Sequence, residues 1–565
     1  MIDESPSLCI SRLQAIPTYD RTVDRRIFLQ RFGAVASLAV FPDLLGACGR
    51  AVAAKRAPRT ARRRQPHRAV STVDGLPVAS WLVAENARKG TLDWVINPKL
   101  HAKRAPIEGF ADRVSVSPGE ELSIFVNTRA SSFRADVYRM GYYSGLGARL
   151  ITTTKDLPGY VQPSPVFTPG INRVECQWRR SFRFIVTDAW PPGNYLIRLS
   201  ASSGRAHFIP VTVRDDASTA AIVMQNSVTT WQAYNHWGGY SLYGGTPING
   251  LSEYESRARV VSFDRPYANP DANGSGDWLG NEFPFLYLAE RHGLDLAYLT
   301  NVDIDENPKL LANHRVLVSL GHDEYWSWQM RYGVQAALLK GLNVAFLGAN
   351  ACYRQIRFGR SSNGPRREVI CYKDYLADPA YAQTPWLATG VSWATTPGQT
   401  PESQFIGAMY QDFGASGDLE VFDPSAFVFR SMDLKQGSKV RGVIGSEFDG
   451  FEPRICPDNV QILAHSSTHG VSGYSDMTYY TTPHGGGVFD SGTADFVTSM
   501  WNGAHQLASR LSFGVVLASD AVGEMTLNLL RVFANGPASL STPSKSNWHS
   551  LYNATAPVNL GTDTT

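Results

Sequence analysis

The sequence predicts an α/β protein with an N-terminal all-β domain: a β-sandwich followed by a parallel-sheet, three-layer α/β domain with antiparallel additions. Three observations support this prediction. Residues 106–215 alternate apolar and polar side chains between Pro/Gly turns, which is typical of short, half-buried strands. From residue 221 onward, short apolar runs alternate with helix-like patterns, which favours a parallel sheet covered by helices. After residue 440 strand-like segments return with little helix between them.

The first 48 residues have the features of an export segment. The stretch Asp24–Gln30 matches the twin-arginine pattern through Arg25 and Arg26, and a modestly apolar stretch follows. Leu45–Cys48 resembles the lipobox of bacterial lipoproteins, in which the cysteine is lipidated. We therefore expect twin-arginine export and a membrane-anchored lipoprotein in the periplasm or on the outer cell surface. A chance arginine pair before a buried helix is the alternative.

Residues 49–77 are predicted to form a basic, disordered linker, because residues 50–68 hold eight Arg or Lys and no acid. The linker is either a plain tether or, beside a lipidated Cys48, a patch for anionic lipid. Of the 53 basic and 50 acidic residues, the first 49 positions hold five of each, so the body beyond the linker is near −5. That charge argues against nucleic acid as the main partner. No apolar run of about 18 residues predicts a membrane-spanning helix.

Residues 78–215 are predicted to be the β-sandwich, with roughly seven or more short strands. Alternating segments at Glu121–Val126 and Phe182–Val186 lie between turns, and His207–Val213 is read as the last strand. The aromatic, glycine-rich run Tyr138–Gly145 has two interpretations. It could bind a glycan or a partner, or it could be a strand and turn that packs against the next domain, which we favour.

Residues 216–537 are predicted to form the α/β domain, and 538–565 an irregular C-terminal tail. Its expected parallel strands are Ala221–Gln225, Leu294–Thr300, Val316–Leu320 and Val344–Leu347, with Arg259–Phe263 as a further candidate. Its expected helices are Glu282–His292, Glu324–Lys340, Ala494–Trp501 and Ala521–Ala534. Its later, antiparallel strands are expected at Val440–Phe448, Ile462–His465, Met477–Thr481 and Val488–Asp490.

A group of polar side chains follows the apolar run Val316–Leu320 directly. They are His322, Asp323, Glu324 and Tyr325. Open α/β sheets bind ligands at the carboxyl ends of their strands, so this group lies where a ligand is expected. His322 is predicted to act as a general base, because its unperturbed pKa of about 6.5 suits proton exchange near neutrality.

The neighbours of His322 have more than one predicted role. Glu324 is expected to orient His322 or to serve as a second ligand, and we place it with His322 among the catalytic residues. Asp323 is expected to cap the helix that follows. In the alternative, purely structural interpretation, Asp323 is the cap and Tyr325 packs beneath the helix.

Several segments together resemble one family. They are Glu85–Arg88 with Gly90–Trp94, Ile107–Ala111, Tyr138–Tyr143, Gln232–Tyr243 and Gly321–Ser327. Over roughly residues 80–535 the chain resembles proteins related to the large (beta) subunit of N,N-dimethylformamidase. Its strand–helix order is also similar to the class I glutamine amidotransferase-like fold.

The resemblance implies a single iron ion, held by two tyrosines and a glutamate, that activates water for amide hydrolysis. Phenolate and carboxylate are hard oxygen donors suited to Fe(III), which lowers the pKa of a bound water. Tyr325 matches one tyrosine, and Glu402, within Pro401–Gly407, matches the glutamate. The second tyrosine has no clean counterpart, since Tyr287 fits only with a shifted register.

Cysteines and histidines offer further candidates. Four cysteines remain after the export segment, allowing three disulfide pairings: Cys176, Cys352, Cys371 and Cys456. Cys352 follows a strand, where amidotransferase-like folds carry a nucleophile, but a structural or disulfide cysteine is the favoured interpretation. Three histidines near the C-terminus are expected to be hydrogen-bonded residues rather than metal ligands: His465, His469 and His484.

Two functions from different classes are compatible with these features. The first is an exported hydrolase of a small amide or related C–N bond, with or without a metal-activated water, acting near His322–Tyr325. The second is a non-catalytic cell-envelope protein that binds a glycan or small ligand. In both cases the partner is a small molecule, and the sequence leaves open the oligomeric state and any small partner subunit.

Overall fold

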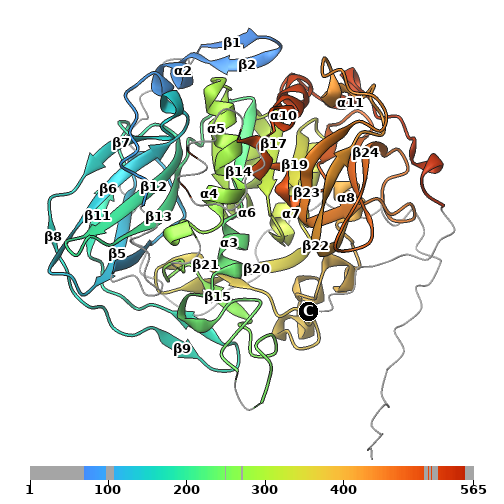
Figure 1. Ribbon diagram of the computed structural model, residues 1–565. Coiled ribbons are helices and arrows are strands. Elements are labelled where there is room, and N and C mark those ends of the chain that lie inside the picture. The colour runs from blue at the N-terminus through green and yellow to red at the C-terminus, as the bar shows by residue number, and fades with distance from the viewer. Residues whose placement is uncertain are drawn as a thin grey trace, which may run out of the picture. The chain divides into compact units, whose positions relative to one another are not determined.

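The computed structural model describes residues 69–96, 107–247, 250–268, 272–501, 507, 511 and 519–553 (Figure 1). The export segment, with Arg25, Arg26 and Cys48, lies outside the described residues, as does most of the predicted linker. Where the structure begins, it corrects the linker prediction. β1 (Val70–Val73) and β2 (Leu76–Ala79) form an antiparallel hairpin. β2 is ordered because the Ala79 N–H donates to the Gly293 carbonyl and the Asp295 N–H to the Pro77 carbonyl.

Residues 107–213 contain two sheets, antiparallel except for the parallel β4–β13 pair, and a short hairpin. The three-stranded sheet has the order β11 (Phe182–Ile185), β5 (Glu121–Thr128), β3 (Ile107–Ala111). The six-stranded sheet contains β4 (Ser115–Val116), β13 (Ala206–Val213), β12 (Gly193–Ala201), β6 (Ser132–Met140) and β7 (Ala148–Thr153), with β8 (Leu157–Pro158) on β6. The hairpin is β9 (Val166–Thr168) with β10 (Arg173–Glu175). The three segments predicted as strands here are confirmed.

The two sheets share one hydrophobic core. Leu122 and Ile124 of β5 meet Val137 of β6 and Ile197 of β12 in this core, and all four are fully buried. Alternation along each strand therefore turns the apolar side chains of both sheets inward, as the sequence pattern predicts.

The second half of the chain is built on a seven-stranded sheet. In spatial order its strands are β16 (Leu296–Thr300), β14 (Ile222–Asn226), β17 (Val316–Gly321), β19 (Asn343–Gly348), β26 (Gly487–Asp490), β25 (Tyr474–Thr481) and β24 (Gln461–Ser467). The first five are parallel and the last two antiparallel. The four predicted parallel strands are confirmed with small shifts at their ends, and β26 joins them as a fifth.

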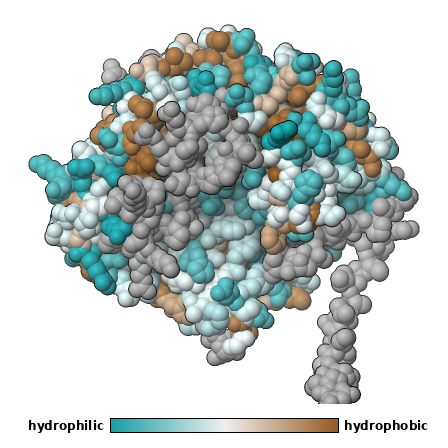
Figure 2. All heavy atoms as spheres, in the orientation of Figure 1, coloured by the Kyte–Doolittle hydropathy of each residue, from teal (hydrophilic) through white to brown (hydrophobic). Residues whose placement is uncertain are grey.

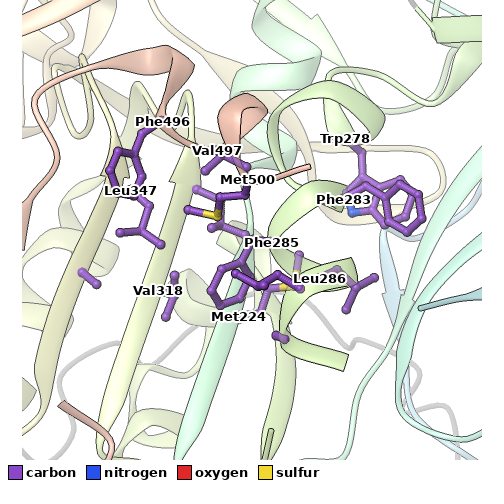
Figure 3. Packing of buried hydrophobic residues seen from close by; sticks show 14 of the residues in the cluster. Met224, Trp278, Phe283, Phe285, Leu286, Val318, Leu347, Phe496, Val497 and Met500 are labelled. Carbon is purple, nitrogen blue, oxygen red and sulfur yellow. The ribbon is translucent and has the colours of Figure 1, made fainter. Parts of the chain in front are cut away.

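Both faces of this sheet are buried, which explains the continuous apolar runs. Met224, Val318 and Leu347 face one core, where Figure 3 shows them with α5 (Phe283–Arg291) and with the 3-10 turns that carry Phe496 and Met500. Their neighbours Val223 and Leu317 face the other core, against α6, α7 and α8. Helices on both faces account for the alternation of strands and helices in the sequence.

The described helices are α2 (Ser80–Asn86), α3 (Val228–Tyr234), α4 (Trp278–Asn281), α5 (Phe283–Arg291), α6 (Asn301–Glu306), α7 (Trp328–Leu338), α8 (Ser403–Ile406), α10 (Asp520–Phe533) and α11 (Ala538–Ser541). Those predicted at Glu282–His292 and Ala521–Ala534 are confirmed as α5 and α10. The helix predicted at Ala494–Trp501 is instead two short 3-10 turns. The predicted irregular tail is partly ordered, because Trp548 is buried against Phe451, with ring centroids 5.3 Å apart.

The helix predicted at Glu324–Lys340 begins later than expected. Tyr325–Ser327 is a short strand, β18, which pairs in parallel with β20 (Arg354–Ser361). The helix α7 starts after it, and its cap is Ser327, whose hydroxyl accepts from the Met330 N–H at 3.1 Å. The prediction that Asp323 caps this helix is therefore wrong.

The strand β18 belongs to a second, four-stranded sheet. Its order is β15 (Val260–Ser262), β21 (Gly364–Ile370), β20, β18. The candidate strand Arg259–Phe263 is thus a strand, but in this sheet rather than the central one. A long hairpin, β22 (Met409–Glu420) with β23 (Lys439–Gly450), completes the strands.

The surface shown in Figure 2 mixes hydrophilic and hydrophobic residues without separating them into large fields. Within the described residues, no helix is long and apolar enough to cross a membrane. All four cysteines beyond the export segment are buried and free of disulfides.

Candidate functional site

The candidate site lies where the order of the central sheet reverses. The chain leaves β14 toward β16 on one side and then returns to β17 and β19 on the other. In such sheets a crevice forms at the carboxyl ends of the two strands that flank this reversal, here β14 and β17. Gly321, at the end of β17, has a φ of +59°, and a Cβ on the adjacent Gly348 would lie 1.8 Å from the Gly321 carbonyl oxygen. Glycine at both positions lets these two strand ends lie against each other.

Glu324, which is completely buried, is the centre of a hydrogen-bonded network at this edge. Its carboxylate accepts from the Tyr243 hydroxyl at 2.5 and 2.7 Å and from the Tyr234 hydroxyl at 2.9 Å. The Arg354 Nε donates to the same carboxylate at 2.6 Å. The two tyrosine rings stack with centroids 4.3 Å apart, and burial raises the pKa of both phenols well above the usual value. Glu324 therefore pairs with Arg354 and is held in position by two phenols.

His322 connects this network to solvent. Its Nε2 lies 3.1 Å from an oxygen of Glu447 and 3.6 Å from an oxygen of Glu324. The side chains of His322 and Glu447 are 13% and 17% exposed, whereas Glu324 is completely buried. Burial alone lowers the pKa of His322, but the Glu447 carboxylate, followed by Glu324, outweighs it and raises that pKa to about 10. The raised pKa favours the imidazolium form of His322, which lies beside the Glu447 carboxylate.

Glu447 was not identified from the sequence. Burial raises its pKa, but the neighbouring His322 imidazolium dominates and holds the pKa below the usual range. It lies on β23, where the pairing with β22 is shifted by bulges and Ser446 has a φ of +46°. Such bulges re-aim side chains, often next to active sites. Because the alternating pattern of Val440–Phe448 shows only a strand, no local signal indicates this residue.

Asp323 forms hydrogen bonds to several elements at this edge of the central sheet. Its carboxylate accepts from the Ser319 hydroxyl at 2.8 Å and from the Asn301 amide at 3.1 Å, and it also bonds the Gln225 amide. Burial raises the pKa of Asp323. These partners come from β17, α6 and β14, so Asp323 ties together the strands that flank the crevice.

Tyr325 and Glu402, the residues matched to iron ligands, each carry an unsatisfied oxygen. The Tyr325 hydroxyl and one Glu402 oxygen are buried and make no hydrogen bond with described residues. A metal ion that prefers oxygen ligands would be bound by such atoms. Their surroundings differ, however. Tyr325 faces Tyr243 and Arg354, whereas Glu402 lies near Arg331.

The third ligand is not provided by Tyr287. Its ring packs against Tyr142 and Trp501, at centroid distances of 5.2 and 6.0 Å, in the core that faces the β-rich region. Among the described residues, no group of three or more His, Cys, Asp or Glu side chains is arranged to hold a metal ion. Tyr325 and Glu402 thus have donor oxygens that suit iron, and Tyr287 packs in a different aromatic cluster.

The remaining candidates, one cysteine and two histidines, make contacts that are typical of structural residues. Cys352 is completely buried, and burial raises the pKa of its thiol well above the usual value, which disfavours the thiolate needed by a nucleophile. His465 pairs with Asp476 at 2.7 Å and stacks on Tyr474. His469 forms a backbone bridge to Ser416.

Comparisons with known proteins identify similar sequences. Two curated relatives, the N,N-dimethylformamidase beta subunits of Alcaligenes sp. and Paracoccus aminophilus, are 21% and 22% identical over 417 residues. Each alignment covers 60% of this chain and 54% of the relative, so the chain spans about half the length of these relatives. A solved structure of a Paenibacillus sp. cycloisomaltooligosaccharide glucanotransferase, with cycloisomaltoheptaose, aligns over 66% of this chain and 68% of that chain, at 9% identity and a TM-score of 0.15.

The family match covers most of the chain and includes the site. Residues 134–506 match the family described as N,N-dimethylformamidase beta subunit-like, C-terminal. The resemblance noted in the sequence is confirmed at the level of the family, while the glutamine amidotransferase-like fold stays a prediction. The chain belongs to the N,N-dimethylformamidase beta subunit-like family.

Proposed function

We propose that this protein hydrolyses a small amide or a related C–N bond at the carboxyl end of β17. The observation that carries the proposal is the His322–Glu447 pair, which forms the partly exposed edge of an otherwise buried charged network. Amide hydrolysis needs a base for the attacking water and an acid for the leaving nitrogen. The pair supplies both, and the related proteins named as dimethylformamidase subunits support an amide as substrate.

The charges of the site support the following roles for these residues. Glu447 accepts a proton from water as the water oxygen adds to the carbonyl carbon. His322 donates its proton to the nitrogen as the C–N bond breaks, and the proton held by Glu447 then restores the imidazolium. Glu324 orients His322, and Arg354 balances its charge.

Iron remains a prediction from the family resemblance, and no step above depends on it. Tyr325 and Glu402 are the residues that would contribute to holding it. Metal analysis of the purified protein tests the prediction, because stoichiometric iron that Tyr325→Phe removes would support it. A protein that binds no iron when expressed with added iron would contradict it.

The hydrolase proposal is tested with the full chain and a panel of small amides, N,N-dimethylformamide among them, by following amine release. We expect turnover of at least one amide and its loss in Glu447→Gln. Glu420→Gln, a change at a partly exposed glutamate on β22, is the matched control and should retain activity. Absence of turnover across the panel, or full turnover in Glu447→Gln, would contradict the proposal.

A non-catalytic role in binding a glycan or small ligand is the second candidate. It is favoured by one observation: protein groups already occupy both oxygens of Glu324, as in a purely structural network. Saturable binding of a ligand that leaves the protein chemically unchanged would support this role over the first.

We also propose, from the sequence, that the protein is exported by the twin-arginine route and anchored through a lipidated Cys48. Cys48→Ser should move the exported protein from the membrane fraction to the soluble fraction. Retention of this variant with membranes at high salt would contradict the lipoprotein prediction.

A further inference from the structure

Lys373 is unusual in both its burial and its backbone conformation. It is 3% exposed, and lysine is seldom buried to this degree. Its φ is +55°, in the left-handed region that residues other than glycine rarely adopt. It lies shortly after the end of β21 (Gly364–Ile370). Strained backbone persists only where the surrounding structure holds it, and such positions are common at functional sites.

The ammonium group of Lys373 lies on the ring of Tyr243. The Lys373 Nζ is 3.3 Å from the centroid of this ring, well within the distance of about 6 Å at which an aromatic face attracts a cation. The ring of Tyr254 is farther from the same atom, at 5.7 Å. Tyr243 also stacks on Tyr234, with ring centroids 4.3 Å apart. An ammonium group and a second phenol therefore fix the position of the Tyr243 ring.

The contact with Tyr243 connects Lys373 to the carboxylate of Glu324. The Tyr243 hydroxyl donates to the two oxygens of Glu324 at 2.5 and 2.7 Å. A cation on an aromatic face draws electron density from the ring, which makes the phenolic O–H a stronger donor. Glu324 in turn lies 3.6 Å from the Nε2 of His322. These contacts form one path from Lys373 to His322.

A buried thiol beside the site also senses the charge of Lys373. Burial raises the pKa of the Cys371 thiol, and the Lys373 ammonium, followed by the Arg354 guanidinium, opposes this rise. The Glu324 carboxylate acts on the same thiol in the opposite direction. Lys373, Arg354 and Glu324 therefore lie within electrostatic range of one another's surroundings.

We propose that Lys373 is a positioning residue of this site: its ammonium group holds the Tyr243 phenol against Glu324, and Glu324 thereby keeps His322 aligned for proton transfer. This role deepens the hydrolase proposal and rests on it for any effect on turnover. Because Lys373 acts through Tyr243 rather than on the substrate, its loss should lower kcat and leave KM unchanged.

Steady-state kinetics of the full chain with Lys373→Met, on the best amide substrate, test the effect on turnover. This change keeps a long side chain and removes its charge. We expect kcat to fall about tenfold, the factor for one contact between a buried cation and an aromatic ring, and KM to stay within about twofold. Lys373→Arg keeps the charge and should retain most of kcat. Lys439→Met, at a lysine on β23 whose side chain is 53% exposed, is the matched control and should behave like the unmodified protein.

The Tyr243→Phe variant separates this role from a purely structural one. Tyr243→Phe keeps the ring and removes the hydroxyl, so adding Lys373→Met to it should cause no further fall in kcat. An equal fall in both backgrounds, or an unchanged kcat in Lys373→Met, overturns the proposal. A folded Lys373→Arg variant that loses as much kcat as Lys373→Met also overturns it, because the charge would then not matter.

Urea unfolding tests the same contact without any substrate. If Lys373 strengthens the hydrogen bond from Tyr243 to Glu324, Tyr243→Phe should lower the urea midpoint less in the Lys373→Met protein than in the unmodified protein. Equal shifts in the two backgrounds overturn the Lys373 proposal even if an amide is hydrolysed. Unequal shifts in a protein that hydrolyses no amide would overturn the hydrolase function and support the Lys373 contact. Lys373→Gln is the second uncharged variant for both measurements if Lys373→Met does not fold.

Discussion

The pairs Arg139–Glu290 and Arg354–Glu324 place the same two residue types in the interior, surrounded by tyrosines. Arg139 lies 2.8 Å from Glu290, both side chains are fully buried, and Tyr143 and Tyr298 complete the hydrogen bonds. This pair connects β6 to α5 and lies entirely in the interior. We call it the closed pair. The network around Glu324, called the open network below, differs because it continues to His322, whose side chain is 13% exposed.

The difference teaches which buried ion pair is a functional candidate. A buried arginine–glutamate pair is compatible with a purely structural role, and Arg139 fills that role by connecting the β-rich region to the central one. The second network keeps an unsatisfied hydroxyl at Tyr325 and a partly exposed acid–base pair. An unsatisfied polar group at the end of a strand, rather than charge alone, therefore indicates the functional site.

The largest expected effect is on the closed pair. Arg139→Met should lower the free energy of unfolding by about 3–5 kcal/mol, because it leaves Glu290 buried without its counter-charge. Urea unfolding measures this. The matched change Arg183→Met, at a side chain 56% exposed beside Glu121, should cost less than about 1 kcal/mol. If the two variants lose equal stability, the closed pair does not hold the two regions together.

The open network should respond to pH where the closed pair does not. Because its folded-state pKa is raised to about 10, His322 contributes stability that is complete below about pH 6.5 and is lost as pH rises through about 10. Glu447, whose pKa is lowered, contributes stability above about pH 4.3 that is lost as pH falls further.

His322→Gln provides the test of this pH dependence. The stability difference between the unmodified protein and this variant should shrink by roughly 1–3 kcal/mol between pH 7 and pH 11. Unfolding free energies measured across this range check the prediction. A difference that stays constant would show that His322 is not held as an imidazolium.

The smallest expected effect separates two tyrosines beside Glu324, the partly buried Tyr243 and the buried Tyr325. Tyr243→Phe should cost about 1–3 kcal/mol, because it removes a hydrogen bond to a buried carboxylate. Tyr325→Phe should change stability by less than about 0.5 kcal/mol, because its hydroxyl has no partner among the described residues. Thermal unfolding of both variants measures the contrast, and equal losses would mean that the Tyr325 hydroxyl is bonded after all.

Local sequence patterns were sufficient for the central sheet. Buried parallel strands such as Val316–Gly321 and Asn343–Gly348 are continuous apolar runs, and their carboxyl ends predicted the position of His322 and Glu324. The start of α7 was predicted wrongly because Tyr325–Ser327 pairs with Arg354–Ile356. That pairing partner is distant in sequence, so helical periodicity alone could not reveal it.

The residues that contact His322 and Glu324 could not be predicted from local sequence patterns, because they too are distant in sequence. Glu447 comes from a hairpin far along the chain and is aimed by a bulge. Tyr234 and Tyr243 belong to a segment that carried the family resemblance, but only the fold brings their hydroxyls onto Glu324. The pKa of His322 also depends on Glu447, which is why we propose the role of an acid for His322 in place of the base predicted from the sequence.

The most direct test of the central claim is a double-mutant cycle on kcat/KM for the best amide substrate, with His322→Gln, Glu447→Gln and both together. If the two residues act as one acid–base pair, each single change should lower kcat/KM by about 10²–10⁴-fold, and the double change should cost little more. Single changes that leave kcat/KM intact, or losses that simply multiply in the double variant, would contradict the pair as the catalytic unit.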